Sequence, residues 1–156
     1  MMEWNRPRSV RQIGSVPGRE RIYVEDYVMR FAKRLAAKQS DNEKAAMLLG
    51  NQYHYNGQKI VQISGIVEIP QFARRNSPVL SPQSWDSVYT EIKENFTDLD
   101  IVGWFYTARD FDRQDAGKLL EIHKANFQHR DKVLYILDEK EQEDGMFLYH
   151  MGNFER

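Results

Sequence analysis

The sequence predicts a single α/β domain in which helices flank a mixed β-sheet. Amphipathic segments with apolar residues at helical spacing alternate with apolar runs of strand length. The dipeptide Asn56-Gly57 separates two such runs, which is typical of a β-hairpin. The chain has 156 residues, of which 41% are hydrophobic and 29% are charged. This length and composition suffice for one hydrophobic core and exclude a disordered or fibrous chain.

The N-terminal half supplies one helix and one hairpin. Residues 25–38 place apolar side chains at helical spacing, with acidic residues in the first turn and basic residues later, as the helix dipole favours. The apolar run 45–50 predicts a buried strand, and the alternating segment 59–69 predicts the returning strand, which Pro70 ends. Residues 71–83 carry further prolines and polar residues and predict a loop.

The C-terminal half alternates between helix and strand. Ser84 is expected to cap the second helix, whose apolar face begins at Trp85. The full order is α-β-β-α-β-α-β-β, and its strand–helix–strand units imply parallel or mixed pairing. The bounds expected in this half are 84–96 and 115–127 for helices and 100–106, 132–137 and 146–151 for strands.

Residues 1–22 are predicted to form an extended basic arm, because prolines and glycines interrupt the arginines there. The arm is either a patch for an acidic partner or a solvated leader. Residues 23–156 are predicted to form the domain. The chain stops without a terminating element, so we expect the N-terminal part of a longer protein.

Composition excludes several classes of protein. The net charge of −1 gives no general attraction to nucleic acid or to an anionic membrane. The absence of cysteine removes disulfides, thiol nucleophiles and thiolate zinc sites, and it fits a reducing compartment. No apolar run could span a membrane and no signal peptide is visible, which predicts a cytoplasmic domain. The four histidines are too far apart in sequence for a local metal pair.

Two segments resemble the MPN domain, the cytidine-deaminase-like fold of the JAMM zinc isopeptidases. In the first, Glu43 stands seven residues before Gly50, which ends an apolar strand. In the second, Gly103-Trp104-Phe105 stands where the family has Gly-Trp-Tyr, and an acidic loop follows. The resemblance covers roughly residues 25–151.

The resemblance implies a degenerate site. Glu43 stands at the position of the general base, and Tyr106 and Ala108 stand where the family has its two zinc-binding histidines. Asp115 corresponds to the third ligand and Asp112 to the preceding serine, across a loop that is shorter than in the family. A phenol and a methyl group are poor replacements for imidazoles, so we expect no zinc, no other cofactor and no peptidase activity. Tyr106 is expected to fill the vacated volume, with its hydroxyl bound by Glu43 or Asp115.

The leading hypothesis is therefore a catalytically inactive module for protein interaction or regulation, with a protein partner or a second copy of the chain. The resemblance also extends to bacterial domains that precede a membrane segment and a LysM module. One alternative is a divergent zinc isopeptidase that uses Glu43, Asp115 and a displaced histidine such as His123. Another is a small-molecule sensor that uses the cleft near Tyr106 and Ala108. The residues expected to form a partner surface are Phe72, Arg74, Arg75, Val79 and Leu80.

Overall fold

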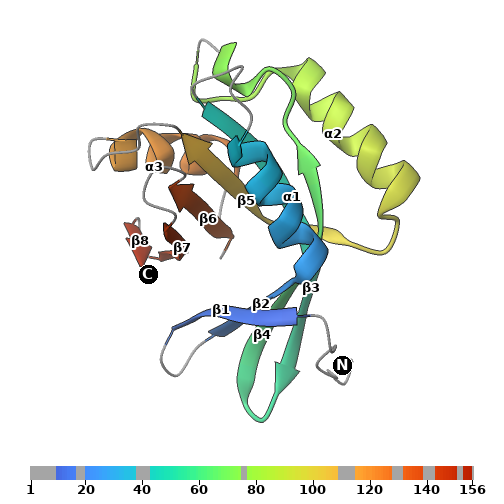
Figure 1. Cartoon of the computed structure of the whole chain (residues 1–156), viewed down its shortest axis with the longest axis vertical. Coiled ribbons are helices and arrows are strands. Elements are labelled where there is room, and N and C mark those ends of the chain that lie inside the picture. The colour runs from blue at the N-terminus through green and yellow to red at the C-terminus, as the bar shows by residue number, and fades with distance from the viewer. Residues whose placement is uncertain are drawn as a thin grey trace.

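The computed structural model describes residues 10–16, 20–37, 43–74, 77–108, 115–127, 132–138, 143–150 and 153–155 (Figure 1). These residues form one mixed sheet of eight strands in the order β1-β2-β4-β3-β5-β6-β7-β8. Pairs β2/β4 and β5/β6 are parallel, and the other neighbours are antiparallel. The strands are β1 (Val10–Val16), β2 (Glu20–Glu25), β3 (Glu43–Tyr55), β4 (Gln58–Glu68), β5 (Asp100–Ala108), β6 (Val133–Asp138), β7 (Glu143–His150) and β8 (Asn153–Glu155).

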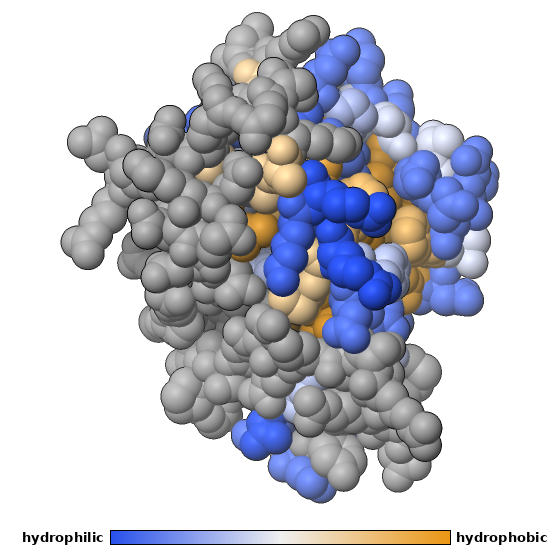
Figure 2. All heavy atoms as spheres, in the orientation of Figure 1, coloured by the Kyte–Doolittle hydropathy of each residue, from blue (hydrophilic) through white to orange (hydrophobic). Residues whose placement is uncertain are grey.

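Helices cover both faces of the sheet. Helix α1 (Asp26–Ala37) packs on one face, and α2 (Pro82–Asn95) and α3 (Asp115–Asn126) pack on the other, together with the short 3₁₀ turn η1 (Phe72–Arg74). The outer side of α1 exposes Arg30, Lys33 and Arg34. Figure 2 shows a strongly hydrophilic group of side chains in the middle of this face, with apolar residues beside it. The structure confirms a mixed α/β fold.

Strand β3 lies at the centre of the sheet and serves both cores. Ala46 and Leu48 belong to the cluster beneath α1, whereas Met47 and Leu49 belong to the cluster beneath α2 and α3. Successive side chains of a strand point to opposite faces, so a strand covered on both sides has no polar alternation. This explains the continuous apolar run that predicted a buried strand here.

The predicted hairpin is present. Asn56 (φ 50°) and Gly57 (φ 75°) both adopt the left-handed conformation, and Tyr55 pairs with Gln58 across the turn. Asn-Gly is favoured in such a turn because both central residues need positive φ. The hairpin fixes the register of β3 against β4.

The predicted arm needs correction. Residues 10–16 and 20–25 are strands, and β2 pairs with β4 in parallel. The boundary expected after residue 22 therefore falls inside β2, where Ile22 and Val24 are fully buried. Glycine did not exclude a strand here, because the register between β1 and β2 shifts between Gln12 and Gly14 and so accommodates it. Residues 1–9 lie outside the described part of the chain.

Helix α2 also differs from its prediction. The cap is Ser81, whose side-chain oxygen accepts a hydrogen bond from the backbone N–H of Ser84 at 3.1 Å. Pro82 begins the helix, because proline is well suited to the first helical position. On the apolar face that was expected to begin at Trp85, Val88 is fully buried but Tyr89 is 55% exposed. Within the described residues, no helix is long and apolar enough to cross a membrane.

Candidate functional site

Glu43 begins β3, and the antiparallel register places it directly opposite Ala108, the last residue of β5. The same register pairs Ala45 with Tyr106. Tyr106 and Ala108 are two residues apart, so their side chains emerge on one face of the sheet. The fold thus brings together three of the residues that the sequence analysis assigned to a degenerate site.

The Glu43 carboxylate accepts hydrogen bonds from side chains of β5 and α3. The Tyr106 hydroxyl donates to Glu43 Oε2 at 2.7 Å, and the Lys118 ammonium donates to the same oxygen at 2.8 Å. The Glu43 side chain is only 12% exposed, whereas that of Lys118 is 44% exposed. The contact between Tyr106 and Glu43 was expected from the sequence. The contact with Lys118 was not, because a lysine on an amphipathic helix carries no pattern that singles it out.

Tyr106 is fixed in place by aromatic packing. Its side chain is 1% exposed, and its ring makes edge contacts with Phe72 (centroids 6.1 Å apart) and Trp104 (6.2 Å). Edge-to-face arrangements of this kind are the favourable ones for aromatic rings. The phenol body therefore belongs to the core, while its hydroxyl reaches the carboxylate at the rim.

His123 supports the same cluster from beneath. The indole N–H of Trp104 donates to His123 Nδ1 at 2.9 Å, and His123 is fully buried. Burial lowers the pKa of His123 to about 4, because desolvation disfavours the charged imidazolium. At neutral pH the ring is neutral, and since Nδ1 accepts a hydrogen bond, its proton is on Nε2. His123 is therefore a hydrogen-bonded residue of the core.

A pocket of about 410 Å³ opens beside Glu43. Its walls come from η1, the loop that follows it and one side of α3. Glu43 and Glu121 contribute carboxylates, Lys118 contributes an ammonium group, and Ile122 contributes an apolar floor. A small polar molecule could enter this space and meet charged groups of both signs.

The described residues around Glu43 do not fit a zinc ion. Zinc in a catalytic site takes about three protein ligands, usually imidazole, thiolate or carboxylate groups. Here Ala108 offers no donor atom, Tyr106 offers a phenol already bound to Glu43, and Lys118 places a positive charge beside the same oxygen. Over the described part of the chain, no three His, Asp or Glu side chains gather closely enough to hold a metal. Asp112 and the side chain of Asp115 lie outside the described residues.

The predicted partner surface is only partly a surface. Phe72 and Leu80 are 3% and 5% exposed, because both side chains pack into the core beneath α2 and α3. They therefore cannot contribute to a docking surface, and that part of the prediction is wrong. Val79 is 56% exposed, as expected. The side chains of Arg74 and Arg75 lie outside the described part of the chain.

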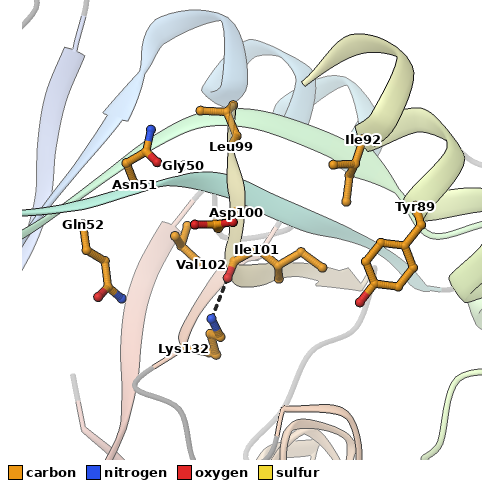
Figure 3. Close-up of a pocket in the computed structure, with 10 residues that line it drawn as sticks. All are labelled: Gly50, Asn51, Gln52, Tyr89, Ile92, Leu99, Asp100, Ile101, Val102 and Lys132. Carbon is orange, nitrogen blue, oxygen red and sulfur yellow. Dashed lines mark hydrogen bonds between the residues drawn. The ribbon is translucent and has the colours of Figure 1, made fainter. Parts of the chain in front are cut away.

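A second pocket, of about 670 Å³, lies at the opposite end of β5, where that strand begins (Figure 3). Tyr89 and Ile92 reach into it from α2 and Gln52 approaches from β3, with Asp100 and Ile101 between them. The sequence analysis missed this pocket. Tyr89 lies on the apolar stripe of α2 but is exposed and lines this pocket. Helical spacing alone does not distinguish such an exposed position from a buried one.

Comparison with known proteins identifies the fold but no family. No protein-family model and no curated protein matches the chain. Among solved structures, the chain is similar to the solution structure of protein DSY2949 from Desulfitobacterium hafniense. The TM-score is 0.56 and the identity is 12%, and the match covers 88% of each chain. At that identity the similarity shows a shared fold and carries no function.

Proposed function

We propose that the chain is a catalytically inactive MPN-like module that acts through contacts with a protein partner. In this proposal the contacts among Tyr106, Glu43 and Lys118 take the place of a zinc centre. The proposal includes a cytoplasmic location, with which the absence of cysteine is compatible. A homodimer remains one form that such a module could take.

The observation that carries the proposal is the engagement of the Glu43 carboxylate by donors from within the protein. A general base must reach the proton of a water or substrate with an unoccupied oxygen at hydrogen-bond distance. Glu43 Oε2 receives both the phenol O–H and the ammonium N–H, so these donors occupy that oxygen. These contacts give Glu43 a structural role that ties β3 to β5 and α3.

The divergent isopeptidase is the weaker proposal. It requires His123 to act as a displaced ligand, but His123 is fully buried and its Nδ1 accepts from Trp104. A catalytic zinc also needs a coordination position open to water. The geometry around His123 offers no such access.

The small-molecule sensor is supported by one observation, the pocket beside Glu43. Its volume of about 410 Å³ lies within the range of pockets that hold small ligands, about 300–1,000 Å³. A thermal-shift screen of small amines and carboxylic acids would test it. Stabilisation that is lost in Glu121→Gln would favour the sensor, and no stabilisation by any compound would contradict it.

The main experiment separates the inactive module from an enzyme. The purified chain is incubated with zinc, dialysed and analysed for metal, and then assayed on a fluorogenic peptide that contains a lysine isopeptide bond. We expect no retained zinc and hydrolysis equal to that of Glu43→Gln, which lacks the Glu43 carboxylate. Stoichiometric zinc after dialysis, or hydrolysis that Glu43→Gln abolishes, would overturn the proposal.

A further inference from the structure

Strand β3 extends well past the strand that flanks it. On one side, β3 pairs with β4 as far as Tyr55, at the hairpin turn. On the other side, pairing with β5 stops at Gly50, opposite Asp100. Within the described part of the chain, no strand pairs with this side of residues 51–55. The hairpin therefore presents an unpaired strand edge, which is a ready template for another chain.

The register shows which backbone groups this edge offers. In a hairpin with a two-residue turn, the residues that flank the turn form a hydrogen-bonded pair, and hydrogen-bonded and open pairs then alternate along the strands. Tyr55 and Gln58 flank the turn, so Tyr53 and Asn51 point their backbone groups toward β4. Gln52 and His54 then direct both N–H and C=O toward the open side. The side chains of both residues are exposed, so the edge is accessible.

The open edge leads directly into the pocket at the start of β5. Gly50, Asn51 and Gln52 line one wall of this pocket, whose volume is about 670 Å³ (Figure 3). The opposite wall is apolar and comes from Tyr89 and Ile92 of α2. The phenol ring of Tyr89 stacks on Trp85 with centroids 5.5 Å apart, which holds this exposed ring in one orientation. A strand that added to β3 would thus carry side chains into a preformed cavity.

Charge defines the chemistry of the occupant. Asp98 and Asp100 are exposed carboxylates at the start of β5. Asp100 itself lines the pocket, while the ammonium group of Lys132 on its far side is directed to the Ile101 carbonyl oxygen at 2.6 Å. A basic side chain of a bound segment would meet complementary charge at Asp100.

We infer that β3 and this pocket together bind an extended, basic peptide segment of a partner protein by strand addition. The peptide runs antiparallel to β3 in line with β5 and pairs with Gln52 and His54. It places an apolar side chain against Tyr89 and Ile92, and a lysine or arginine beside Asp100. Main-chain hydrogen bonds then supply affinity, and the pocket and the carboxylates supply selectivity. This inference rests on the proposed function of a protein-interaction module and names the class of partner.

The test selects binders from a display library of random linear peptides on the full chain and synthesises the strongest one. We expect alternating apolar and basic residues in it and slowed amide hydrogen exchange at Gln52 and His54. Gln52→Pro, which removes the outward N–H at an edge position that tolerates proline, should weaken binding by about tenfold or more. Gln52→Thr keeps that N–H and should bind as the native chain does. Tyr89→Ala should also weaken binding, whereas Val79→Ala, which removes a distant exposed apolar side chain, should not.

Each contrary result separates the site from the function. If no peptide is selected, or if the selected peptide protects other amides and ignores Gln52→Pro, the strand-addition site is wrong. The inactive module would still stand in that case, provided that the chain retains no zinc. If the native chain sediments as a dimer that Gln52→Pro dissociates, a second copy occupies the edge and the peptide proposal is overturned.

Discussion

Tyr106 combines a buried ring with a hydroxyl that holds Glu43, so two substitutions should separate these contributions. Tyr106→Ala leaves a cavity among Phe72 and Trp104, and we expect a loss of about 3–5 kcal/mol in the free energy of unfolding. Tyr106→Phe keeps the packing and loses one hydrogen bond, for which about 1 kcal/mol is expected. Urea unfolding of the three proteins measures both values. Equal stability of native and Tyr106→Ala protein would contradict the buried placement.

His123 should make stability depend on pH. Burial lowers its pKa from 6.5 to about 4 in the folded state, so the unfolded chain binds the proton first as the pH falls. The free energy of unfolding is therefore not reduced by His123 above about pH 6.5, and it falls by about 3 kcal/mol as the pH falls toward 4. In His123→Gln that part of the pH dependence should vanish. Parallel urea titrations of the two proteins between these pH values provide the measurement, and curves of identical shape would refute it.

Among the elements, the parallel pair β5/β6 depends on a glycine. A Cβ added at Gly103 would lie 2.2 Å from the Val133 carbonyl oxygen, and a backbone atom cannot move away without parting the strands. Gly103→Ala should cost about 1–3 kcal/mol of stability, as overpacking usually does. Gly117 in α3 provides a matched control, because an added Cβ there meets nothing within 4 Å. Gly117→Ala should stabilise by about 0.5–1 kcal/mol, so chemical unfolding should give opposite signs for the two changes.

The start of α2 supports a second contrast. Ser81→Ala removes the oxygen that accepts from the backbone of Ser84, and about 1 kcal/mol of stability should be lost. Ser84→Ala removes a weak 3.4 Å hydrogen bond from the Ser84 hydroxyl to the Pro70 carbonyl. It also removes the oxygen that accepts a hydrogen bond from the Ser81 hydroxyl, but it leaves the cap in place. Thermal melting points should therefore fall further for Ser81→Ala. A larger fall for Ser84→Ala would instead support Ser84 as the cap, as the sequence predicted.

Elements with strong local patterns were predictable, and those defined by distant pairing were not. Asn56-Gly57 determines a turn by its own conformational preference. Strand β3 was predictable because its apolar run supplies side chains to both faces of the sheet. Strand β2 is stabilised by its pairing with β4, and the sequence of residues 20–25 does not specify that partner. The same limit applies to the site. The contact between Glu43 and Tyr106 was expected only because the resemblance implied it, and the register of β3 against β5 was not predicted. Lys118 reaches Glu43 from helix α3, whose packing depends on tertiary contacts that the sequence pattern does not specify.

At the scale of the whole molecule, the site around Glu43 joins β3, β5 and α3, so two side chains should not restore a metal centre. In the double variant Tyr106→His with Ala108→His, two imidazoles would share one strand face. The Lys118 ammonium would remain 2.8 Å from Glu43 Oε2 if that oxygen keeps its place, and it would repel an added cation. We expect weak zinc binding by calorimetry and background hydrolysis of an isopeptide substrate. Adding Lys118→Ala should raise zinc affinity, and tight binding without that change would contradict the argument.

The two largest apolar clusters lie on opposite faces of the same central strands, since β3 and β5 contribute side chains to both. Neither cluster can therefore melt while the other persists, because loss of one face removes the strand that the other face packs on. Small domains in which every core shares a strand behave as one cooperative unit, without a partly unfolded state that keeps half its structure. A shift of β3 by one residue would turn each of its side chains to the opposite face of the sheet. Ala46 and Leu48 would then leave the cluster beneath α1, and Ala45, Met47 and Leu49 would leave the cluster beneath α2 and α3. The position of β3 is thus fixed by packing on both of its faces, although residues 51–55 of the same strand present an unpaired edge within the described part of the chain.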